Sequence, residues 1–166
     1  MKSSTVSKFM IAALAVAATS AVAAEGPRKG CVELKTVAET AVDYIDAQGQ
    51  RATKLVPAAK VIPGTEVVWT VTASNVCDKP ADKVFIDNPI PPQMSYVPDS
   101  AVGAGADIQF STDGRQFADA ASLRVSDADG SQRAARSSDY THIRWSLRNP
   151  IGPGQVAVAR YRAALK

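Results

Sequence analysis

The sequence has few of the residues that build metal centres and acid–base catalytic sites. It contains one histidine, His142, and two cysteines, Cys31 and Cys77. A nucleophile–histidine–acid triad needs a hydroxyl beside the histidine, but Ser146 is four residues further along a predicted strand, about 13 Å away. A blue-copper site needs two histidines, and zinc needs more ligands at closer spacing. We therefore expect no catalytic residue, no metal and no cofactor.

Long hydrophobic runs are also missing, apart from one near the start of the chain. Lys2 and Lys8 precede an apolar run over residues 9–18, and small residues follow to Ala24. This pattern is typical of a cleaved signal peptide, residues 1–24. The alternative, an uncleaved membrane anchor, needs about 20 apolar residues. We therefore expect a soluble, exported protein, periplasmic or secreted to the cell surface or medium, with no transmembrane segment after cleavage.

Charge of one sign is not concentrated in the sequence. The formal net charge is +3, and it falls to +1 when Lys2 and Lys8 leave with the signal peptide. Nucleic-acid binding depends on concentrated lysine and arginine that neutralise phosphates. The composition therefore gives no support for a nucleic-acid partner.

The two cysteines both lie in the predicted mature chain. Cys31 precedes the first predicted strand, and Cys77 follows the strand that contains Trp69. In an oxidising compartment an even number of cysteines favours a disulfide, here closing a loop of about 45 residues. The alternative is two unrelated free thiols. A redox role is disfavoured, because no Cys-x-x-Cys pair is present.

Apolar residues recur at every second position in several segments, which predicts strands with one buried face. The clearest strand covers residues 65–76, and others cover 83–87, 94–97, 108–111, 141–148 and 155–165. Residues 54–61 are predicted as an edge strand, since Pro57 lacks an amide donor. Residues 38–50 fit either a short helical turn or a further strand, and 117–140 fit a long loop with one weak strand at 122–126.

These segments predict an all-β fold, a two-sheet sandwich of about seven or eight strands with Greek-key connections. No long amphipathic helix is expected after the signal peptide. The predicted core consists of Val67, Trp69, Val71, Ile86, Phe110, Ile143, Trp145, Leu147 and Tyr161.

The order of several motifs resembles a known family. Pro63-Gly64, the strand from Trp69 to Asn75 and the Asp87–Pro92 exit occur in sequence, followed by the 139–145 run and the Gly152-Pro-Gly154 turn. This order is similar to that of the conserved-repeat domain of bacterial surface and exported proteins, domain of unknown function eleven. The resemblance covers residues 54–166, after an N-terminal strand and irregular lead-in at 25–53. It implies an immunoglobulin-like extracytoplasmic sandwich, present here in a single copy, and no enzymatic activity.

Four arginines in the last two predicted strands form a candidate interaction face: Arg144, Arg148, Arg160 and Arg162. If these strands form a hairpin, the arginines line one solvent face. That face would suit an acidic partner, or it would only be a charged edge that limits aggregation.

We therefore expect a non-enzymatic, exported cell-envelope protein with a structural or protein-interaction role. Its partner would be another envelope protein or a second copy, bound at a sheet edge or at the polar loop 118–140. The alternative is a periplasmic accessory or ligand-binding factor that recognises acidic envelope components through the arginine face.

Overall fold

The computed structural model describes residues 30–103 and 105–166. The predicted signal peptide, residues 1–24, lies outside these ranges. The described chain is almost entirely β-structure, which confirms the predicted all-β class. Its elements are β1 (Val32–Ile45), β2 (Arg51–Pro57), β3 (Glu66–Asn75), β4 (Phe85–Pro89), β5 (Met94–Tyr96), β6 (Val102–Gly103), β7 (Ala106–Ser111), β8 (Arg124–Ser126), β9 (Gln132–Ala134), the 3-10 turn η1 (Ser137–Asp139), β10 (His142–Leu147) and β11 (Val156–Leu165).

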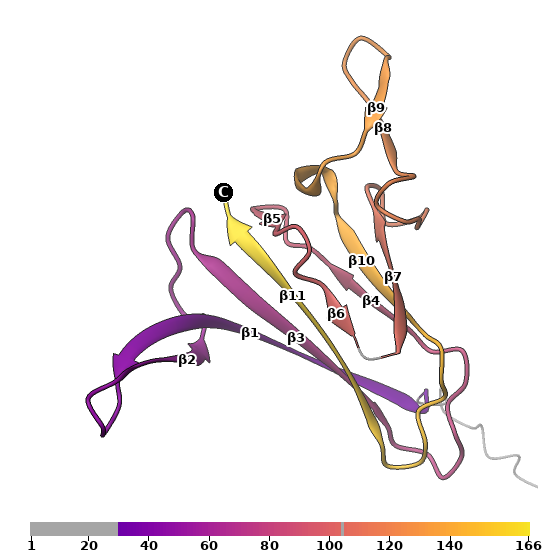
Figure 1. Ribbon diagram of the computed structural model, residues 1–166. Coiled ribbons are helices and arrows are strands. Elements are labelled where there is room, and N and C mark those ends of the chain that lie inside the picture. The colour runs from indigo at the N-terminus through magenta and orange to yellow at the C-terminus, as the bar shows by residue number, and fades with distance from the viewer. Residues whose placement is uncertain (1–29, 104) are drawn as a thin grey trace, which may run out of the picture.

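The strands form two facing sheets and a separate hairpin (Figure 1). The larger sheet has the order β2-β1-β3-β11-β5, and β6 also pairs with β11. The smaller sheet has the order β4-β10-β7, and β8 pairs with β9. All pairings within these sheets are antiparallel. The first three strands all belong to the larger sheet, and after β3 the chain crosses repeatedly between the two sheets, as in a sandwich.

The core lies between the two sheets, where the inward side chains of each strand meet. The Tyr161 ring from the larger sheet lies 6.1 Å from the Trp145 ring of the smaller one, measured between centroids. The Nδ2 of Asn88 donates a hydrogen bond of 2.8 Å to the Tyr161 hydroxyl. Burial raises the pKa of that hydroxyl, and the bond from Asn88 opposes the shift. The hydroxyl therefore stays protonated at neutral pH and links the sheets as a neutral group.

Seven of the nine predicted core residues are buried, and the exceptions are Trp69 and Leu147. Leu147 is the last residue of β10, so it lies at the rim of the smaller sheet. Trp69 stacks on Tyr161, with ring centroids 6.2 Å apart, but it neighbours β1 in the larger sheet. Leu34 of β1, on the same inner face, is 52% exposed. The three-stranded smaller sheet therefore leaves part of the inner face at β1 uncovered.

Residues 38–50, for which a helical turn and a strand were both open, continue β1 as far as Ile45 and then turn into β2. The turn is closed by a 2.9 Å bond from the Asp46 amide to the Gln50 carbonyl. The predicted edge strand is confirmed as β2, at the end of the larger sheet. It begins at Arg51 rather than residue 54, and it ends at Pro57.

The predicted loop with one weak strand, residues 117–140, contains two strands instead. β8 and β9 form a hairpin that turns at Gly130, whose φ is +83°. Arg133 in β9 binds Asp127 at 2.9 Å and Asp139 at 2.6 Å. Ion pairs rather than alternating apolar side chains hold this hairpin, so the periodicity that reveals buried strands did not reveal β9.

The predicted disulfide between Cys31 and Cys77 is present, with Cα atoms 5.2 Å apart. It joins the residue before β1 to the segment after β3. The Val76 amide donates a 2.9 Å hydrogen bond to the Cys31 carbonyl beside it. The bridge therefore fixes the start of β1 on the sheet.

Candidate functional site

The four candidate arginines do not share one face, because the last two strands do not form a hairpin. β10 lies in the smaller sheet and β11 in the larger one. Arg144 alternates with the buried Ile143 and Trp145, while Arg160 and Arg162 flank the buried Tyr161. Each set points away from the common core, so the arginines of β10 and β11 lie on opposite outer faces. The predicted hairpin, and the single basic stripe that depended on it, are wrong.

Arg144, on the outer face of the smaller sheet, is surrounded by a carboxylate and two aromatic rings. Its Nε and Nη2 donate bonds of 2.7 Å to the two carboxylate oxygens of Asp87, the residue opposite it in β4. The guanidinium carbon lies 3.8 Å from the centre of the Phe117 ring and 5.4 Å from that of Phe85. The Asp87 bond raises the pKa of Arg144. These contacts already occupy the guanidinium group.

The other three arginines also contact neighbouring side chains. Arg148 donates a 2.9 Å bond from its Nε to Asp107, and Arg162 donates 2.6 Å to Glu66. Arg160 donates 3.1 Å to the Thr70 hydroxyl. Three of the four arginines are therefore neutralised by a carboxylate within the fold.

The only histidine, His142, lies on the outer face of the smaller sheet with Arg144. The His142 ring lies 6.5 Å from the Phe117 ring, and its Nδ1 is 3.0 Å from the Thr141 hydroxyl. It covers the turn at Gly114, where an added Cβ would approach the His142 ring to 2.7 Å. Among the described residues, no group of three or more His, Cys, Asp or Glu side chains is placed to hold a metal ion.

The far end of β1 and its partner β2 extend from the larger sheet as an arm, defined here as residues 41–55. β1 pairs with β3 only as far as Thr40, and residues 41–45 pair with β2 alone. Figure 1 shows the arm at the left, directed away from the smaller sheet. Its large apolar side chains are exposed to solvent: Tyr44 by 41%, Ile45 by 63% and Leu55 by 39%.

The outer edge of the arm carries backbone groups that point away from the sheet. Antiparallel pairs alternate between bonded and non-bonded positions. Backbone hydrogen bonds join Asp46 to Gln50 and Ala58 to Ala38, at the two ends of the β1–β2 pairing. In this register the even-numbered residues of β2 are therefore the ones whose backbone groups bond to β1. The amide and carbonyl groups of Arg51, Thr53 and Leu55 therefore face outward. Within the described residues, β2 pairs with no strand except β1.

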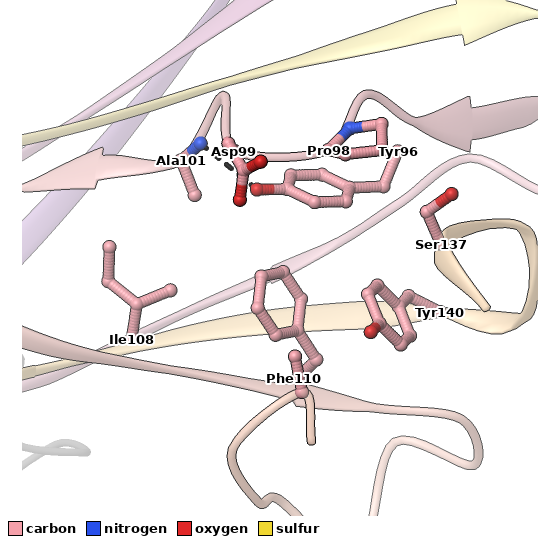
Figure 2. Close-up of a pocket in the computed structure, with 9 residues that line it drawn as sticks. Tyr96, Pro98, Asp99, Ala101, Ile108, Phe110, Ser137 and Tyr140 are labelled. Carbon is pink, nitrogen blue, oxygen red and sulfur yellow. Dashed lines mark hydrogen bonds between the residues drawn. The ribbon is translucent and has the colours of Figure 1, made fainter. Parts of the chain in front are cut away.

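A second candidate site is a cavity of about 350 Å³ between the two sheets, called the aromatic pocket (Figure 2). Tyr96 and Asp99, from β5 and the loop after it, lie on one side, and Ile108, Phe110 and Tyr140 lie on the other. The Phe110 and Tyr140 rings stack with centroids 4.5 Å apart, and Tyr96 lies 4.9 Å from Phe110. Burial, with smaller effects from Tyr96 and Asp139, raises the pKa of the Tyr140 hydroxyl. The pocket is therefore lined by neutral aromatic rings and one carboxyl group.

No family model, curated protein or solved structure matches this chain. Among the described residues, no helix is long and apolar enough to span a bilayer. The resemblance to the conserved-repeat domain stays a prediction.

Proposed function

We propose that this chain is a non-enzymatic, exported cell-envelope protein with a protein-interaction role. In this proposal the sandwich is immunoglobulin-like, as the family resemblance implies, and it presents β2 to an extended segment of another envelope protein. The disulfide between Cys31 and Cys77 is compatible with export, because such bonds persist in oxidising compartments.

The observation that carries the proposal is the unpaired edge of β2 at the end of the arm. A two-stranded ribbon is only marginally stable in water, because it buries little apolar surface. An open strand edge is a template for another strand, and extended peptides commonly bind by adding a strand to such an edge. The outward amides of Arg51, Thr53 and Leu55 supply the hydrogen bonds for that addition.

Charge on β2 favours a different protein over a second copy as the partner. The strand contains Arg51 and Lys54 but no acidic residue. Two copies joined edge to edge would bring four cations together, whereas a segment with carboxylates would form cross-strand pairs of opposite charge. We therefore expect an extended partner segment that combines acidic and apolar residues.

The alternative role, recognition of acidic envelope components by the arginine face, loses its main support. Its arginines lie on opposite sides of the sandwich, and Arg144, Arg148 and Arg162 already bind carboxylates. No other feature of these four residues favours a ligand site.

In-cell cross-linking of edge variants tests the proposal. Thr53→Pro removes an outward amide and no backbone bond to β1, and β2 already ends in a proline at the outward position 57. It also removes the 2.8 Å bond from the Thr53 hydroxyl to Asp43 of β1, so the control must lack that bond too. We expect a discrete cross-linked species with the unchanged protein in envelope or culture fractions, and its loss with Thr53→Pro. Thr53→Val, which also lacks the hydroxyl but keeps the amide, is the matched control and should retain the species.

Amide exchange at Val42 and Tyr44 in the purified variants checks that the arm still pairs. A cross-linked species that survives Thr53→Pro, or a lone monomer in every fraction, would contradict strand addition at β2. A species with twice the mass of the chain would instead identify a second copy as the partner.

A further inference from the structure

The residues that line the aromatic pocket take no part in the proposed strand addition. Three aromatic rings, from Tyr96, Phe110 and Tyr140, line it together with the aliphatic Ile108. Its volume of about 350 Å³ lies within the range of small-molecule sites. No lysine or arginine is among its lining residues, so the Asp99 carboxylate is the only charged group in the lining.

The loop that carries Asp99 is fixed rather than loosely attached. The amide and hydroxyl of Ser100 both donate hydrogen bonds to the Val97 carbonyl, at 3.3 and 2.6 Å. The Ala101 amide donates a 3.1 Å bond to the Tyr96 hydroxyl, drawn as a dashed line in Figure 2. These bonds form one side of the pocket in advance of any ligand, so little ordering is needed on binding.

Asp99 occupies a left-handed backbone conformation. Its φ is +56°, at the third position of the Val97–Ser100 turn, after Pro98. Glycine usually takes this position, and asparagine and aspartate tolerate it, because their short polar side chains can bond the local backbone. The Asp99 side chain is exposed, and it lies on the same side of the pocket as Tyr96 (Figure 2).

We propose that the aromatic pocket binds a small organic cation, an ammonium compound with an aryl or alkyl body. The ammonium group lies near the Asp99 carboxylate, since opposite charges attract. The apolar body contacts Ile108 and Phe110. This inference is independent of strand addition, because no residue of the pocket belongs to the arm.

The direct test measures binding of three ligands of similar shape by chemical-shift titration of the purified chain with its disulfide intact. The probes are 2-phenylethylamine, which is cationic at pH 7, neutral 2-phenylethanol and anionic 3-phenylpropionate. We expect saturable shifts at Phe110 and Tyr140, with the cation bound about fivefold more tightly than the neutral probe. The anion should bind most weakly.

Two variants locate the ligand. Asp99→Asn suits the left-handed backbone and should reduce the preference for the cation to near unity, while Asp78→Asn, a matched change in the segment beside the disulfide, should leave it intact. Ala120→Trp places a large ring at an exposed lining residue and should abolish binding of all three probes. Equal binding of the neutral and cationic probes, an unchanged preference in Asp99→Asn, or shifts confined to other residues would overturn the proposal.

Discussion

The arm and the sandwich body differ in how the same strand is stabilised. Between Val32 and Thr40, β1 pairs with β3 inside the larger sheet, whereas from Ala41 to Ile45 it pairs only with β2. In the body, large side chains such as Trp145 and Tyr161 have no exposed surface. In the arm, the large apolar side chains are exposed to solvent, and the backbone hydrogen bonds between β1 and β2 hold the two strands together. The first half of β1 thus belongs to the stable body, and the second half supports β2, whose outer edge is the proposed binding edge.

The disulfide belongs to the body end of that strand. Cys31 immediately precedes β1, and Val32 pairs with Asn75, two residues before Cys77. The bridge fixes β1 at the end opposite the arm. We therefore expect changes in the body or at the bridge to alter global stability, and changes in the arm to alter binding.

The largest loss of stability should come from the centre of the core. Trp145→Ala removes a side chain with no exposed surface and should lower the free energy of unfolding by about 3–5 kcal/mol. Tyr44→Ala, an aromatic truncation in the arm, is the control and should have a much smaller effect. Urea denaturation measures both, and a similar loss in the two variants would remove the distinction between body and arm.

Loss of the disulfide should have the next largest effect. Cys31→Ser with Cys77→Ser removes a bridge between residues 46 apart in sequence and should destabilise the chain by about 2–4 kcal/mol. Reduction of the unchanged protein should reproduce the shift in the urea midpoint. A serine variant as stable as the oxidised protein would show that β1 is held by its pairing with β3 alone.

The β8–β9 hairpin should respond to acid, since it is held by charge. The Arg133 guanidinium, with the Arg136 backbone amide, lowers the pKa of Asp139 from 3.8 to about 2. Because the folded-state pKa lies below the unfolded value, the stabilisation is complete above about pH 4 and is lost as the pH falls from 4 to 2. The Asp139 carboxyl carbon should titrate in that window by NMR, together with the Arg133 side-chain resonances. The part of the Arg133 response that follows Asp139 should vanish in Asp139→Asn, while Asp127 still contacts the Arg133 guanidinium. An Asp139 midpoint near 4 would contradict the ion pair.

The sequence revealed the parts of the molecule where burial imposes a pattern. Alternating apolar residues identified β3, β10 and β11, because each buries one face, and the cysteine count predicted the bridge. Much of the arm gave no clear signal, since both of its faces are largely exposed. Residues 41–45 fitted either a helical turn or a strand, and β2 was predicted only from Lys54 onward. Periodicity reports burial, so a strand that buries neither face is difficult to distinguish from a loop.

The single arginine face was not found, and the aromatic pocket could not be predicted, for a related reason. Alternation correctly placed Arg144 and Arg160 on outward faces, but it does not specify the sheet to which a strand belongs. The aromatic pocket combines Tyr96, Phe110 and Tyr140 from separate segments, and no local motif connects them. Gly103 is a further example: an added Cβ there would lie 2.6 Å from the Trp145 ring, a contact that exists only after the sheets have packed.

The smallest change in stability should come from the apolar side chains of the arm. Leu55→Thr keeps the outward amide and a good strand former, so the free energy of unfolding should stay within about 0.5 kcal/mol of the unchanged protein. The same variant should weaken cross-linking to the partner, because Leu55 lies at the edge where the added strand would pack. Urea denaturation and the cross-linking yield measure the two effects separately. A loss of stability without a change in cross-linking would place Leu55 with the body, and the separation of a stabilising body from a binding arm would then be incorrect.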